Sequence, residues 1–292
     1  MSVFQQNLKE KSVSVVIGQE NLSFQPESKK SIDLEMFFIN ILLLGLVFAY
    51  SSNYLTLPIF LPLFYAIAMR FFIGNHDRMH ASQHDRLPRF FEAITEGFAV
   101  VVTPWDEPFD SVKWKHLKHH STHVSGKSAP FDTKSDPHSA FELGGFLRVF
   151  ISCVFYEEIQ LYFDIRDRKL TRSRLYRFLI YTPLLIAFIY TFGLNTYLIV
   201  LLAMKITGFS VWFLFSWGLH QPVIYNFGFA KQVPIFVNWI TTILFGRRIS
   251  AGITHHSTHH AWPSIPYNQL DKFDSATLRN PEYAPEMLPI GA

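Results

Sequence analysis

Cysteine is almost absent from this sequence: Cys153 is the single thiol among 292 residues, so no disulfide can form within one chain. The sequence also has no CxxC pair, no HExxH motif of zinc metalloproteases and no CxxCH motif for covalent haem. These absences exclude a disulfide scaffold, a CxxC metal or redox site and an HExxH protease.

Charged side chains are scarce as well. They make up 17% of the residues against 49% that are hydrophobic, and the mean hydropathy is positive, at +0.15. The formal net charge of +3 is too small to indicate nucleic-acid binding. Because the apolar residues are clustered in long blocks, they indicate membrane spans rather than the core of a soluble domain.

Two apolar blocks, residues 36–74 and 177–220, are each long enough for two membrane crossings, since one crossing takes about 20 residues of helix. Each block is interrupted near its middle by polar residues or glycine, at 51–54 and 193–196. The blocks therefore predict four transmembrane helices, over residues 36–50, 55–74, 178–192 and 197–219.

Three shorter apolar stretches, at 93–103, 141–163 and 233–245, are interpreted as helices that lie at the membrane interface or pack on the cytosolic part. Nearly all Lys and Arg residues lie in the N-terminal segment, in residues 75–176 and in the C-terminal segment. By the positive-inside rule, these segments face the cytoplasm.

The predicted fold is therefore an all-α, multi-pass integral membrane protein. We expect a four-transmembrane-helix bundle with a cytosolic histidine-rich cap and both termini in the cytoplasm. The chain divides into a cytoplasmic N-terminal tail (1–33), a membrane domain (34–270) and a C-terminal tail (271–292).

Histidine is abundant, and eight of the 13 residues fall into three boxes, HxxxH, HxxHH and HxxHH: His76 and His80; His116, His119 and His120; His256, His259 and His260. Residues three or four apart on a helix share a face, so each box can present two or three imidazoles to one point. Two predicted crossings separate the second box from the third, which places all the boxes on one side of the membrane. His220, at the end of the fourth predicted helix, lies on that side too.

Eight or nine imidazoles exceed the needs of one metal ion, since a structural zinc site takes four ligands and a catalytic one takes three. Two metal ions with four or five nitrogen ligands each fit the count. Imidazole binds iron, copper, zinc and nickel, so the ligand type alone does not select the metal.

In box order, box spacing and intervening spans, residues 36–270 resemble the membrane fatty acid desaturase/hydroxylase superfamily. The stretch from His256 to Tyr267, HSTHHAWPSIPY, resembles the third box and following turn of desaturases, and KWKH, ending at His116, resembles the approach to the second. The resemblance implies a non-haem centre of two Fe ions (Fe2+/Fe3+), O2 as co-substrate, and the eight box histidines as ligands. It also implies His220 as a further ligand, although Ser216 stands where some of these enzymes have an asparagine.

The resemblance further implies a lipid or acyl-thioester substrate and two electrons from a donor of the ferredoxin or cytochrome b5 type. That donor is separate, because the chain has no HPGG-type cytochrome b5 motif. The Trp-Pro-Ser-Ile-Pro turn favours fatty-acyl desaturation. Hydroxylation or ketolation of an alkane, carotenoid or other lipid begins with the same C–H cleavage and stays open. A membrane protein that binds metal or haem without catalysis is the alternative from another class.

Asp77, next to His76, has two interpretations. A carboxylate in this position can orient a metal-binding imidazole through its second ring nitrogen. It can equally be a solvated acid or a partner of Arg78 at the helix end.

Overall fold

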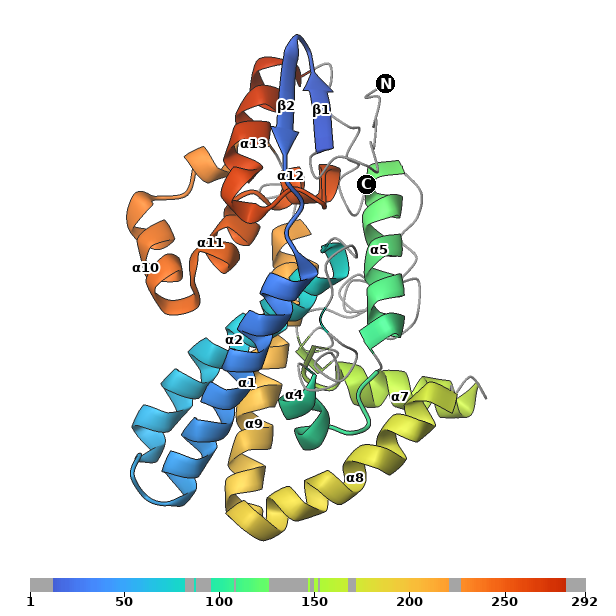
Figure 1. Ribbon diagram of the computed structural model, residues 1–292, viewed down its shortest axis with the longest axis vertical. Coiled ribbons are helices and arrows are strands. Elements are labelled where there is room, and N and C mark those ends of the chain that lie inside the picture. Colours follow the sequence, from blue (N-terminus) through green and yellow to red (C-terminus); the bar gives the residue numbers. More distant parts are fainter. Residues whose placement is uncertain are drawn as a thin grey trace.

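Most of the chain is helical, as Figure 1 shows. The computed structural model describes residues 13–81, 87, 96–107, 109–125, 147, 150–151, 153–167, 172–220 and 227–281, without the side chains of residues 13, 118, 119, 121–125, 173, 216, 217 and 220.

Four helices are long and apolar enough to cross a membrane: α1 (Lys29–Ser51), α2 (Leu57–His80), α8 (Arg172–Phe192) and α9 (Leu194–Val211). They lie together in the lower half of Figure 1. The turns between them fall where the sequence predicts, and Asn53 and Gly193 adopt φ values of 62° and 85° there, which asparagine and glycine tolerate best. The prediction of four spans is confirmed.

Three of these helices, α1, α2 and α8, extend further into polar sequence than predicted. For α1 and α2 the reason is a buried ion pair. Arg78 Nε lies 2.8 Å from Asp33 Oδ1, and their side chains are 1% and 0% exposed. The Arg78 guanidinium also lies over the ring of Phe109, 4.5 Å from its centroid. Paired in this way, both charges can be buried between the first turns of α1 and the last turn of α2. Hydropathy alone does not reveal such a pair.

The interior of the bundle is a continuous apolar core that includes Leu43, Phe60, Phe64 and Val200. The short helix α4 (Gly97–Val102) packs into it, in contact with α1, α8 and α9. The backbone N–H of Phe98 donates to Asn40 Oδ1 of α1 at 2.9 Å. The described part of the stretch 93–103 is therefore packed inside the bundle.

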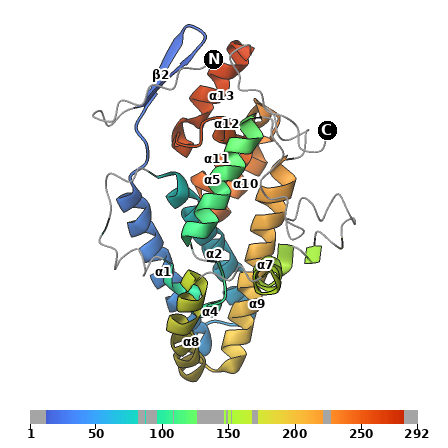
Figure 2. The same cartoon turned by 90° about the vertical axis from the view of Figure 1, so that its right-hand side faces the viewer.

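Beyond Val211 the chain continues as a π-helix, η1 (Trp212–Trp217), and a 3₁₀ turn, η2 (Gly218–His220). The remaining helices are α5 (Phe109–Ser125), α7 (Tyr156–Arg166), η3 (Phe229–Lys231), α10 (Ile235–Phe245), α11 (Arg247–Thr254), α12 (His256–Ala261), η4 (Tyr267–Gln269) and α13 (Leu270–Arg279). Figure 2 shows α5 in front of α12, with which it is in contact, in the half of the molecule away from the α1–α2 turn.

Helix α10 is apolar and at least partly exposed along its whole length. It is attached to α2, because Arg70 Nε donates to the carbonyl oxygen of Phe245 at 3.2 Å and the rings of Tyr65 and Phe245 pack edge to face. An exposed apolar helix beside a membrane span agrees with the interfacial position expected for residues 233–245.

A β-hairpin precedes α1 and was not predicted. Strands β1 (Val13–Ile17) and β2 (Glu20–Phe24) pair antiparallel, with Ile17 opposite Glu20. Val15, Ile17 and Phe24 pack against Trp262 and α13. The hairpin and α13 lie largely in the predicted N-terminal and C-terminal tails. The division at residues 33 and 270 stays a prediction.

Candidate metal centre

The first histidine box lies on the last turn of α2. Because the helix continues to His80, His76 and His80 are four residues apart on one face, with ring centroids 5.1 Å apart. The helix therefore continues six residues beyond the predicted end of the span at residue 74. The Asp33–Arg78 pair holds this turn against α1.

The second and third boxes approach the same point from two other helices. In α5, His116 and His120 share a face in the same way, and α12 adds His259. His80 Nε2 and His116 Nε2 lie 2.8 Å apart, and His116 Nε2 and His120 Nε2 lie 2.9 Å apart. One nitrogen from each of five histidines lies within 4.8 Å of the others: His76, His80, His116, His120 and His259. We call this group the histidine cluster.

The histidine cluster fits a metal ion. Two nitrogens bound to one ion at about 2.1 Å are at most about 4.2 Å apart, close to the spread seen here. Both ring nitrogens of His259 are buried, and neither has a hydrogen-bond partner among the described residues. Burial holds the pKa of His116 and His259 well below the usual value, so these rings are neutral. Neutral imidazole is the form that binds metal.

Further imidazoles adjoin the cluster on α12. The His260 ring is 4.2 Å from that of His120 and 4.6 Å from that of His256, measured between centroids. All three are buried. The side chains of two further predicted ligands, His119 on α5 and His220 in η2, lie outside the described part of the chain. That the nine histidines bind metal stays a prediction.

The short helix α12 is fastened to α13 through Asp274. This carboxylate accepts hydrogen bonds from Thr258 Oγ1 at 2.8 Å and from the Gly228 N–H at 2.9 Å. His255 Nδ1 lies 3.4 Å from its other oxygen. Although burial opposes it, hydrogen bonding from His255 and the two other donors lowers the pKa of Asp274. His255, outside the HxxHH register, therefore helps to position the third box.

His76 has two oxygen partners at its Nδ1 atom. Asp77 Oδ1 is 3.3 Å away and the Tyr267 hydroxyl is 2.9 Å away. When Nε2 of a neutral histidine binds metal, the ring hydrogen is on Nδ1 and can be donated to such an oxygen. The orienting interpretation of Asp77 is thus supported. Tyr267 was missed; its signal was its place at the end of the Pro-containing turn after the third box.

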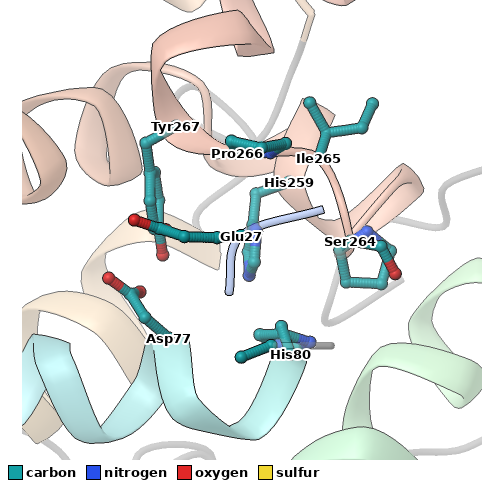
Figure 3. A pocket seen from close by; sticks show the side chains of 10 residues that line it. Glu27, Asp77, His80, His259, Ser264, Ile265, Pro266 and Tyr267 are labelled. Carbon is teal, nitrogen blue, oxygen red and sulfur yellow. The ribbon is translucent and has the colours of Figure 1, made fainter. Parts of the chain in front are cut away.

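A small pocket of about 20 Å³, room for about one water molecule, opens beside the histidine cluster (Figure 3). Its wall includes Glu27, Asp77, His80, His259 and Tyr267. Burial raises the pKa of Tyr267 well above its usual value, so its hydroxyl stays protonated.

Comparison with known proteins agrees with this geometry. A family model described as fatty acid desaturase matches residues 52–288, a range that contains all nine predicted ligands. No curated protein and no solved structure matches the chain significantly.

Proposed function

We propose that this chain, which belongs to the fatty acid desaturase family, is an O2-dependent di-iron desaturase that introduces a double bond into a lipid acyl chain. Family membership makes the protein an oxidoreductase and indicates a lipid substrate. The observation that supports the proposal most is the convergence of five imidazole nitrogens from three helices at one point.

Two iron ions are the proposed occupants. The histidine cluster supplies one set of nitrogens, and His256 and His260 extend it on the side of His120. His119 and His220 are proposed to complete the second set. When bound, the iron supplies the O2 activation that removes hydrogen from an unactivated methylene, which no side-chain acid or base can do.

The protein itself positions the metal-binding imidazoles and shields them from solvent. Helices α2, α5 and α12 bring the imidazoles to one point, and burial keeps the described box histidines of α12 away from solvent. The overall conversion takes one CH2–CH2 unit, one O2, two electrons and two protons to an alkene and two water molecules. We propose a separate ferredoxin- or cytochrome b5-type donor for the electrons.

The proposed orientation places the histidine cluster in the cytoplasm. It rests on the concentration of Lys and Arg in the segments outside the two short turns. The four membrane helices make the protein a multi-pass membrane protein in either orientation.

The test is expression in a host with a simple lipid profile, followed by mass spectrometry of its fatty acids, with His259→Ala as the matched control. We expect an unsaturated acyl species that the control lacks. If the product is a hydroxylated lipid instead of an alkene, the proposed activity changes from desaturation to hydroxylation, which would use the same histidine ligands. An unsaturated product formed equally by His259→Ala would refute the metal assignment.

A further inference from the structure

The segment before the first span is tied to the histidine cluster by a single guanidinium. Arg248, on α11, pairs with Glu27, which lies between β2 and α1. The same side chain reaches Glu35 Oε2 at 2.9 Å and Asp77 Oδ2 at 3.4 Å through Nη1. Arg248 thus joins three carboxylates from three parts of the chain.

Asp77 links this network to the metal centre. Its side chain is 2% exposed, with Oδ2 toward Arg248 and Oδ1 toward His76 Nδ1. A buried carboxylate needs a compensating cation or several donors to stay in place. Arg248 supplies the cation, and the orientation of Asp77 in turn fixes the partner that His76 finds at Nδ1.

The hairpin determines where Glu27 lies, because Glu27 follows strand β2 by three residues. The apolar side chains of Val15, Ile17 and Phe24 anchor the two strands on α13 and the turn after the third box. The chain then passes the pocket, where Glu27 lies beside Tyr267 and above Asp77 and His80 in Figure 3. Residues 13–51 lie outside the range that the family model matches, so this contact is an addition to the matched part.

We propose that the segment before the first span is a working part of the metal centre, in which Glu27 and Arg248 act as positioning residues that hold Asp77 and, through it, the ring of His76. The inference rests on the proposed function in taking His76 as a metal ligand. It adds that the site is incomplete without residues outside the matched range.

The test uses the full-length protein, stripped of metal and titrated with Co2+, whose visible absorption reports ligand number and geometry. Glu27→Ala and Arg248→Met act on His76 only through Asp77, so they are expected to weaken Co2+ binding by up to about 10-fold, the lower end for loss of an outer partner of a metal ligand, and to change the spectrum. Arg248→Lys, which keeps the charge, is expected to lie between Arg248→Met and the unchanged protein.

Glu20→Ala is the matched control. Glu20 also joins the hairpin to α13, through two hydrogen bonds with Arg279 at 2.8 and 3.0 Å, but it has no contact with the Asp77 network in the described residues. We expect its Co2+ titration to match that of the unchanged protein. If Glu20→Ala weakens binding as much as Glu27→Ala, the hairpin has only a structural role and the proposal is overturned.

Superimposable titrations for Glu27→Ala and the unchanged protein would also overturn the proposal. His259→Ala, run in parallel, separates the two hypotheses: it must lose Co2+ if the histidine cluster is the metal site at all. Thermal unfolding of each metal-free variant shows whether it is folded. Should Arg248→Met not fold, Glu27→Ala and Glu20→Ala decide the question alone.

Discussion

Two groups of polar side chains differ in how their atoms are paired: one includes residues of helix α5, and the other contacts the loop that precedes α5. In the histidine cluster, ring nitrogens converge on one another, and His259 has no hydrogen-bond partner among the described residues. In the second group, the charge cluster of Glu157, Asp164 and Arg174, opposite charges meet directly.

The polar atoms of the charge cluster find hydrogen-bond partners within the protein. Arg174 donates to Asp164 Oδ2 at 2.6 Å, to the Trp105 carbonyl at 3.0 Å and to the Glu157 carbonyl at 3.3 Å. Buried polar groups in native proteins are nearly always paired. The contrast therefore teaches that the charge cluster is a structural connection between α7, α8 and the α4–α5 loop, whereas the histidine cluster is arranged for an ion.

The largest effect is expected from His259→Ala. Because loss of an outer partner of a ligand already costs about 10- to 100-fold, loss of a ligand should lower activity by more than about 100-fold and remove bound metal. Metal per chain, measured by mass spectrometry on folded protein, is the readout. If this variant kept its full metal content, the histidine cluster could no longer be distinguished from the charge cluster as a metal site.

Arg174→Met should have the opposite effect to His259→Ala: it should lower stability and leave the metal content unchanged. It leaves Asp164 and Glu157 without their cation and is expected to lower the free energy of unfolding by about 3 kcal/mol, the lower end for a broken buried pair, because both acids are partly exposed. Metal per folded chain should not change. Denaturant unfolding in detergent measures the first quantity, and metal loss exceeding the loss of folded protein would contradict the structural role.

Tyr267→Phe removes one of the two oxygen partners of His76 while Asp77 remains. We expect metal affinity to fall by about 10-fold, the smaller end of the range for such partners. Competition with a metal chelator measures the affinity. Tyr65→Phe, whose ring packs on Phe245 away from the histidines, is the control and should have no effect on affinity.

The smallest effect concerns pH and Asp106, next to the charge cluster. Burial, reinforced by repulsion from Glu157, raises the pKa of Asp106 from 3.8 to about 8. The raised pKa favours the protonated acid in the folded state, so stability falls as pH rises from 3.8 to about 8. The unfolding temperature should therefore drop between pH 6 and pH 8, on the order of a few degrees, and Asp106→Asn should flatten this part of the profile. If the unfolding temperature of Asp106→Asn fell equally between pH 6 and pH 8, the decrease would come from other titratable groups.

The length of the apolar blocks was sufficient to predict the spans, and the spacing of the histidines was sufficient to predict which of them share a helix face. The apolar blocks have the length of membrane helices, and the four-residue spacing of His76 and His80 has one meaning on a helix. The hairpin had a local signal too, since β-branched and other apolar residues largely alternate with polar ones on both sides of Gly18. The polar composition of the first 33 residues nevertheless led to the prediction of a tail.

Contacts between distant residues could not be predicted in the same way. Glu27 and Arg248 are 221 positions apart, and Tyr267 and His76 are 191 apart. Neither pair leaves a periodic signature, because each depends on how the helices pack. Similarly, the burial of Asp33 in the first turns of α1 depends on Arg78, 45 positions away in the sequence.

The π-helical segment η1, which continues α9 toward His220, affects how many residues the chain needs between the two. A π-helix closes its hydrogen bonds over five residues rather than four, so the segment contains a residue more than an α-helix would need. Deleting one residue from 212–217 would restore α-helical pitch and leave the backbone at His220 in nearly the same direction, because the wider π-turn already accommodates the additional residue. A single deletion within α9 would instead turn the backbone that follows it by about 100°, so η1 is the part of this helix where the loss of one residue should do least damage.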